Sequence, residues 1–144
     1  MGKKRVVKKG DQGSREASAA SIQKKKLKHK ITSGHVYINS TYNNTLITIT
    51  DNSGGVVFAG SAGALGFNGA KKGTPYAASK VAELLSEKAK AIGLLELNVF
   101  VRGVGAGRES AIRSFAANGL VINSIKDITP VPFNGTKFPK VRRV

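Results

Sequence analysis

The sequence contains no cysteine, which excludes disulfides, thiolate zinc sites and cysteine nucleophiles. Its two histidines leave a transition-metal site without its usual ligands, so we expect no cofactor. Apolar runs are short, far below the length of a membrane span. Carboxylates are scarce as well, because eight Asp and Glu stand against 24 Lys and Arg, giving a formal net charge of +16. This excess predicts a soluble protein that binds a polyanion and has no membrane partner.

The positive charge is concentrated at the two ends of the chain. Residues 1–30 carry 11 basic and two acidic side chains, and residues 131–144 carry four basic and no acidic ones. Residues 31–130 carry nine basic and six acidic side chains, as an ordinary domain would. We therefore predict a flexible basic arm over 1–30, an α/β RNA-binding body over 31–130 and an extended basic tail over 131–144. A solvated arm without a partner and an organelle import signal are the alternatives for residues 1–30.

Hydrophobic alternation and β-branched runs predict five strands. In the first, Val36 and Ile38 alternate with polar residues and are expected on the buried side. Turn-forming residues follow the first strand at Asn43-Asn44 and the second at Asp51–Gly55. The predicted strands cover residues 35–39, 45–50, 56–59, 95–101 and 120–128.

Two helices are predicted between the last three strands, giving the order βββαβαβ. Thr74 as N-cap and Pro75 in the first turn begin one helix, which ends at Gly93. Residues 60–73 contain five glycines and are expected to form no regular element. The fold class is therefore α/β, a single domain whose mixed sheet of about five strands packs against two helices. The inward-facing helical residues are predicted to be Val81, Leu85, Ala89, Ile92, Ala111, Ile112, Phe115 and Ala116.

The glycine-rich loop over residues 66–74 is the first candidate RNA contact. Glycines allow backbone amides to approach phosphates, Lys71 and Lys72 add charge, and Phe67 offers a ring for stacking. The helix that begins at Thr74 adds its positive dipole end. The alternative is a mobile loop whose Phe67 folds onto the core.

The second candidate is the junction over residues 103–108. A dinucleotide fingerprint would need glycine where Arg108 stands, and the sequence has no GK[ST] triplet for a P-loop. A helix start approached by glycines, with Arg108 beside it, still suits an RNA phosphate. The alternative is a tight crossover turn in which Glu109 complements the helix dipole.

The tail is the third candidate. Its prolines exclude helix and interior strand, and Phe133 and Phe138 interleave with basic residues, as expected of a segment that runs between RNA helices. Solvated disorder is the alternative. Asn134 precedes Gly135, whose unhindered nitrogen favours succinimide formation, so Asn134 is a candidate for modification to isoaspartate.

Five motifs in a fixed order make the chain resemble the universal small-subunit ribosomal protein eleven family in its bacterial form. They are Asn43-Asn44-Thr45, the 66–75 loop with Ala77-Ala78, Gly107–Ser110, Asp127–Pro130 and Asn134-Gly135. The resemblance implies a ribonuclease H-like fold and a structural role on the platform of the small subunit. It also implies contacts with several rRNA helices, a place beside the mRNA (Shine-Dalgarno) cleft, and small-subunit proteins seven and eighteen as neighbours.

With this resemblance, the chain is expected to act in the ribosome of the cytoplasm, or less readily of an organelle, and not as a homo-oligomer. An RNA-binding module that works outside the ribosome, without catalysis, is the alternative function. A two-metal nuclease is disfavoured because the first predicted strand carries no carboxylate. The predicted rRNA-binding residues are Lys24, Lys25, Lys26, Lys28, Lys30, Asn43, Asn44, Phe67, Lys71, Lys72, Arg108, Lys137, Lys140, Arg142 and Arg143.

Overall fold

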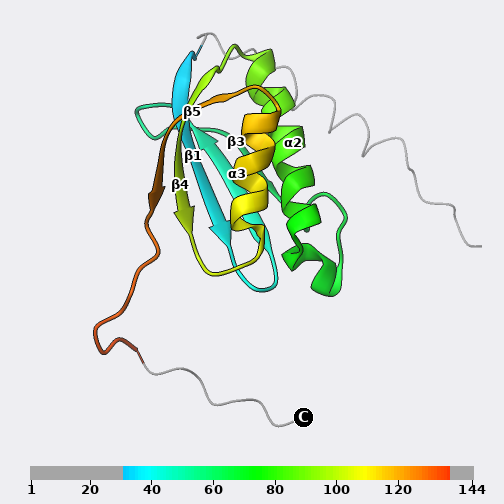
Figure 1. The fold of residues 1–144 in the computed structure, drawn as a ribbon, viewed down its shortest axis with the longest axis vertical. Helices are drawn as coiled ribbons and strands as arrows, with labels where there is room; N and C mark the ends of the chain where they lie inside the picture. The colour runs from blue at the N-terminus through cyan, green and yellow to red at the C-terminus, as the bar shows by residue number, and fades with distance from the viewer. Residues whose placement is uncertain (1–30, 137–144) are drawn as a thin grey trace, which may run out of the picture.

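The computed structural model describes residues 31–136 of the chain (Figure 1). The predicted arm over residues 1–30 lies outside the described residues, and so do residues 137–144 of the predicted tail. Nine of the predicted RNA contacts therefore fall outside the described part: Lys24, Lys25, Lys26, Lys28, Lys30, Lys137, Lys140, Arg142 and Arg143.

The strands form one mixed sheet in the order β3-β2-β1-β4-β5. The first three strands pair antiparallel, whereas β4 and β5 run parallel to β1. Alternating and β-branched residues suit this sheet, because one side of each central strand is buried and the other is not. The strand bounds are β1 Ser33–Ser40, β2 Thr45–Thr50, β3 Val56–Ser61, β4 Glu96–Arg102 and β5 Val121–Asp127.

Two helices, α2 (Pro75–Ala91) and α3 (Gly107–Ala117), pack against each other and against the same face of this sheet (Figure 1). Val81 and Leu85 of α2 and Phe115 of α3 are fully buried between the helices and the strands. Burying each of these side chains contributes about 1.5–3 kcal/mol, so this layer is the core of the domain. Within residues 31–136, no helix is long and apolar enough to cross a membrane. The predicted single α/β domain with a five-stranded mixed sheet and two helices is confirmed.

Two local predictions were wrong. The glycine-rich segment was expected to hold no regular element, yet β3 extends to Ser61 and a 3-10 helix, η1, covers Gly69–Gly73. A 3-10 turn closes over few residues and tolerates glycine where a longer helix would not. Ala116 was expected to face inward but is exposed. The buried side of α3 is narrow, since its buried residues are Gly107, Ala111 and Phe115, spaced four apart, and Ala116 is turned away from that line by one helical step.

The topology gathers several loops at one end of the body. Because β1, β4 and β5 are parallel, their carboxyl ends lie together, and both helices begin at this end (Figure 1). We call this region the loop end; it consists of residues 41–44, 66–74 and 103–107. The described chain enters β1 at the opposite end of the sheet and leaves β5 at the loop end.

Candidate nucleic-acid interface

The turn between β1 and β2 forms the centre of the loop end. The amide of Thr41 donates to the carbonyl of Asn44 at 2.9 Å, and the amide of Asn44 donates to the Thr41 hydroxyl at 3.1 Å. The turn predicted at Asn43-Asn44 is therefore present, with Asn43 exposed to solvent. It places Asn43 on the surface of the loop end, whereas Asn44 is half-buried and its Oδ1 is buried without a hydrogen-bond partner among the described residues.

Two glycines allow the neighbouring loops to approach this turn. A Cβ on Gly73 would lie closer than 3.0 Å to the carbonyl oxygen of Tyr42. A Cβ on Gly103 would lie just as close to the carbonyl oxygen of Ser40, and Gly103 has a φ of +95° that L side chains rarely adopt. The glycines predicted to admit phosphates thus also bring the three loops together.

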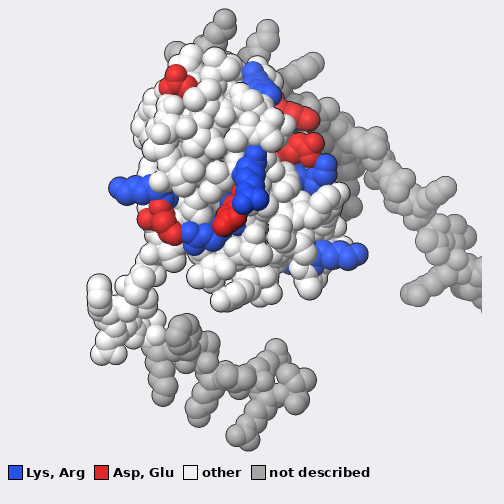
Figure 2. Space-filling model, in the orientation of Figure 1, with Lys and Arg blue, Asp and Glu red and all other residues white. Residues whose placement is uncertain are grey.

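Lys71 and Lys72 lie in η1, on the rim of the loop end. Lys71 is exposed and Lys72 is half-buried, and within residues 31–136 neither ammonium group forms an ion pair. On the face of the body seen in Figure 2, by contrast, most acidic groups adjoin basic ones. A lysine without a carboxylate partner can pair with a polyanion without first breaking an ion pair.

Both helix N-termini add positive partial charge at this end. In α2, the Thr74 hydroxyl accepts from the Ala77 amide at 3.3 Å, as an N-cap should. The first turn of α3 has no such side-chain cap, so no N-cap side chain accepts from its backbone amides. A phosphate oxygen is the acceptor that such a helix start suits best.

Arg108 joins the start of α3 to the end of β5. Its guanidinium donates to the carbonyl of Gly103 and forms an ion pair with Asp127. The Thr129 hydroxyl donates to the same carboxylate at 2.6 Å and accepts from the Gly103 amide at 3.1 Å. Arg108 therefore already has protein partners, which supports the alternative of a tight crossover turn over an RNA contact. Its side chain is still 30% exposed.

This network perturbs the titration of Asp127. The hydroxyl of Thr129, and after it the guanidinium of Arg108, lower the pKa of Asp127 from 3.8 to about 2. Hydrogen bonds and a neighbouring cation both favour the charged carboxylate. Asp127 is thus ionised at any physiological pH and holds the start of the tail against the loop end.

Phe67 does not stand free for stacking. Its ring is partly buried, packs against the hydrophobic core and meets the Tyr76 ring edge-on at 6.1 Å between centroids. The alternative in which Phe67 folds onto the core is therefore favoured over a base-stacking role.

The described part of the tail, residues 131–136, contains no helix or strand and is exposed throughout. Phe133 is 98% exposed, so it contributes nothing to the core of the described body. The chain bends at Asn134, which has a φ of +56°. Asn134 is accessible to solvent, and its modification stays a prediction.

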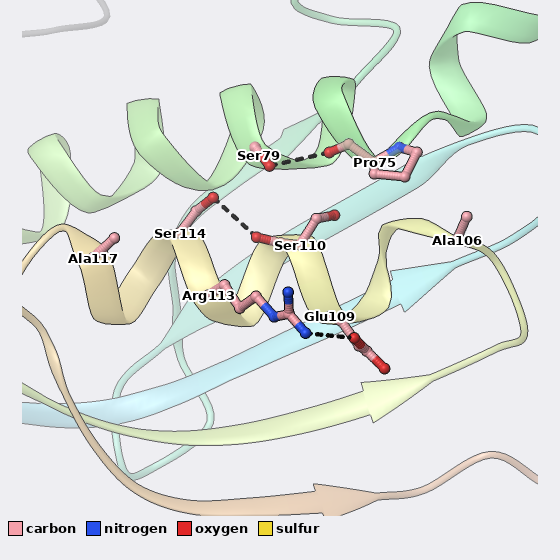
Figure 3. A pocket seen from close by; sticks show the side chains of 8 residues that line it. All are labelled: Pro75, Ser79, Ala106, Glu109, Ser110, Arg113, Ser114 and Ala117. Atoms are coloured by element: carbon pink, nitrogen blue, oxygen red, sulfur yellow. Dashed lines mark hydrogen bonds and ion pairs between the residues drawn. The ribbon is translucent and has the colours of Figure 1, made fainter.

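A shallow groove of about 420 Å³ lies between α2 and α3. Figure 3 shows that its polar side chains bond within their own helices: Ser79 donates to the Pro75 carbonyl, Ser114 to the Ser110 carbonyl, and Arg113 pairs with Glu109. None of the predicted RNA-contacting residues lines this groove. Within the described residues, no group of three or more His, Asp or Glu side chains could hold a metal ion.

Arg102 was not among the RNA contacts predicted from the sequence. This residue ends β4, lies exposed beside the loop end and forms no ion pair with a described residue. A signal was available, because Arg102 directly precedes the glycines at 103, 105 and 107 that were taken as a phosphate-binding turn.

Comparisons with known proteins agree with the motifs on which the resemblance rests. The profile of the family described as Ribosomal protein S11 matches residues 34–143, which include the loop end and most of the tail. Two relatives named "Small ribosomal subunit protein uS11" come from two strains of Treponema pallidum, one of which is the Nichols strain. Each is 52% identical over 125 residues, which is 87% of this chain and 99% of the relative.

Proposed function

The chain belongs to the ribosomal protein S11 family, and from this membership we propose that it bridges rRNA helices on the platform of the small subunit. Membership makes it a structural component of the small ribosomal subunit, a ribonucleoprotein in which it binds rRNA during translation. It is not an enzyme. The proposal concerns which surfaces hold the RNA and what they help to build.

The observation that carries the proposal is the composition of the loop end. Two helix N-termini, one of them uncapped by a side chain, meet there with Lys71 and Lys72, which have no described ion-pair partner. Asn43, which is exposed, lies at the same end on the turn between β1 and β2. Helix dipoles, a helix start without a side-chain cap and unpaired lysines together suit the phosphate backbone of RNA, and such contacts position a protein on its RNA.

The placement of the two basic terminal segments supports bridging. The described chain enters the sheet at one end and leaves it at the other, so residues 1–30 and 131–144 are attached at opposite ends of the body (Figure 1). Together these segments carry 15 of the 24 basic residues. Attachment at opposite ends would let them reach different rRNA helices.

In this arrangement the body, the arm and the tail are three functional units, and RNA contacts extend over all the basic residues predicted from the sequence. The tail contacts comprise Lys137, Lys140, Arg142 and Arg143, and the arm contacts comprise Lys24, Lys25, Lys26, Lys28 and Lys30. We further propose that this platform position contributes to the cleft holding the mRNA and adjoins small-subunit proteins seven and eighteen. Residence in cytoplasmic ribosomes is part of the same proposal.

Charge reversal at the loop end tests the proposal. The variant Lys71→Glu/Lys72→Glu should leave the small subunit during a high-salt wash followed by sedimentation, whereas the parent chain should co-sediment stoichiometrically. The physical reason is that two contacts with phosphates would become repulsive. The matched control is Lys88→Glu/Lys90→Glu, which makes the same change near the far end of α2, away from the loop end.

Equal retention of the two variants would show that the loop end has no special role. A parent chain that stays at the top of the gradient would instead favour an RNA-binding module acting outside the ribosome. The experiment therefore distinguishes failure of the loop end as the RNA-binding site from failure of the proposed ribosomal function.

A further inference from the structure

The sheet has an open face, which is the side turned away from α2 and α3. Strand residues alternate between the two faces, and Val36 and Ile38 point into the core, so Tyr37 between them lies on the open face. Tyr37 is paired with Phe100 on β4 and with Thr48 on β2. Within residues 31–136, no element covers this face, and the Tyr37 side chain is 36% exposed.

Aromatic rings form the centre of the open face. Tyr37 and Phe100 stack with 5.0 Å between ring centroids and 14° between ring planes. The ring of His35 meets Phe100 edge-on at 5.4 Å. The strands place Asn39 and Asn98 beside these rings, so the apolar centre is bordered by uncharged hydrogen-bonding groups.

The basic side chains of the open face lie toward the loop end. Arg102 follows Phe100 by two residues on β4, and Lys126 is paired with Phe100 on β5. Both are exposed, and neither forms an ion pair with a described residue. The acidic residue of this face, Glu96, lies at the opposite end of β4 and accepts a hydrogen bond from Asn123 at 3.0 Å.

We propose that the open face binds an unpaired stretch of rRNA, with bases against the Tyr37–Phe100 pair and phosphates at Arg102 and Lys126. This inference rests on the proposed function and extends it to a surface on the other side of the sheet from the helices. A single strand is the form that fits, because only unstacked bases can pack on aromatic side chains. Arg102 and Lys126 lie at the edge nearest the loop end, so one RNA chain can pass from one surface to the other.

The charges decide between RNA and a protein as the occupant. An apolar protein surface could cover the rings, but it would bury or border two cations that have no carboxylate partner among the described residues. RNA supplies apolar base faces and anionic phosphates together, so it satisfies both features of the face.

The test measures binding of the full chain to small-subunit rRNA transcribed in vitro, over a series of salt concentrations. Tyr37→Leu/Phe100→Leu keeps apolar volume but removes the rings, and we expect about tenfold weaker binding with an unchanged salt slope, within the range for loss of base stacking. Arg102→Gln/Lys126→Gln should also weaken binding and reduce the log–log slope by about 1.4–1.8, the value for two phosphate contacts.

Matched controls make the same chemical changes elsewhere. Phe58→Leu alters an aromatic ring on the core side of β3, and Lys88→Gln/Lys90→Gln removes two charges from α2. Both should bind rRNA as the parent does. The Arg102→Gln/Lys126→Gln variant changes only exposed side chains, so it decides the question even where loss of the rings perturbs folding.

The outcomes separate the two proposals. If the parent binds with a steep salt dependence and both open-face variants bind equally well, the open face is not an RNA surface and the proposed function stands. If the parent does not bind rRNA at all, the proposed function fails first. Ultraviolet cross-linking in assembled subunits should yield base adducts at Tyr37 or Phe100, and adducts to a protein at these positions would overturn the inference.

Discussion

At the residue scale, Arg108, Asp127 and Thr129 fix the point where the chain leaves the sheet. Arg108 and Asp127 form an ion pair, and Thr129 donates to the carboxylate from both its amide and its hydroxyl. Charge-assisted hydrogen bonds of this kind are stronger than neutral ones, although exposure to solvent weakens the ion pair. The network gives the tail a defined starting direction beside the loop end.

The lowered pKa of Asp127 predicts a specific acid dependence of stability. Because its folded pKa is about 2 against an ordinary 3.8, the carboxylate stabilises the fold above pH 3.8 and loses this effect as the pH falls toward 2. Asp127→Asn lacks the titrating group. The difference in free energy of unfolding between parent and variant should therefore shrink between about pH 4 and pH 2.

Urea unfolding at several pH values measures this difference. Thr129→Val provides the second variant, since it removes the hydroxyl that contributes most to the lowered pKa, and it should shift the loss of stability to higher pH. A difference that stays constant down to pH 2 would contradict the role assigned to the network.

The partners of Arg108 could not be predicted from the sequence. Asp127 lies 19 residues away and Thr129 lies 21 residues away, and only the parallel pairing of β4 with β5 brings them together. Local pattern analysis finds a charge next to a glycine turn but not a long-range acceptor. The proposed contact of Arg108 with phosphate accordingly stays a prediction.

At the element scale, the best predicted elements had strong local signals at their ends. The second strand was predicted over residues 45–50, as observed, because a β-branched run lies between two turns. The start of α2 was predicted from Thr74 and Pro75, which act as N-cap and first-turn residue in the structure.

The errors at η1 and Ala116 arose where the sequence carries no strong local signal. A 3-10 turn has almost no sequence signature, and the buried width of α3 depends on what packs against it.

The tail is predicted to be an RNA-binding element that contributes little to folding. Its described residues beyond Pro130 are exposed, whereas Ile128 still donates its amide to the carbonyl of Val101 at 2.8 Å. Deletion of residues 131–144 should therefore leave the free energy of unfolding within about 0.5 kcal/mol of the parent, as for surface changes. The same deletion should weaken binding to rRNA, because it removes four basic residues.

Equilibrium unfolding and rRNA binding of the truncated chain check the two halves of this prediction. A deletion of residues 129–144 is the control, since it also removes the Thr129 hydroxyl that bonds Asp127 and Gly103. It should lose stability where the shorter deletion does not. A large loss of stability on removing residues 131–144 alone would place Phe133 or Phe138 in the core.

At the scale of the whole molecule, the candidate interface is a product of topology. The sequence separately indicated the turn at Asn43-Asn44, the loop over residues 66–74 and the junction over 103–108. It did not indicate that they meet, because that follows from the parallel order of β1, β4 and β5. The open face was missed for a related reason: the alternation that buries Val36 and Ile38 also exposes Tyr37, but its partner Phe100 is more than 60 positions along the chain.

The distribution of charge over the whole chain predicts how steeply RNA binding depends on salt. Within residues 31–136, Lys80, Arg108 and Arg113 form ion pairs with Glu83, Asp127 and Glu109, whereas Lys71, Lys72, Arg102 and Lys126 have no ion-pair partner among the described residues. The two terminal segments add 15 further basic residues to the chain. We expect on the order of 6–10 phosphate contacts, each contributing about −0.7 to −0.9 to the slope of log K against log salt concentration. The full chain should therefore bind small-subunit rRNA with a slope of roughly −4 to −9. Removing residues 131–144 should make the slope shallower by at most about 2.8–3.6, because four basic residues are lost. Binding of the parent measured at several salt concentrations gives the slope directly, and a value near zero would mean that its sixteen excess positive charges do not meet the RNA backbone.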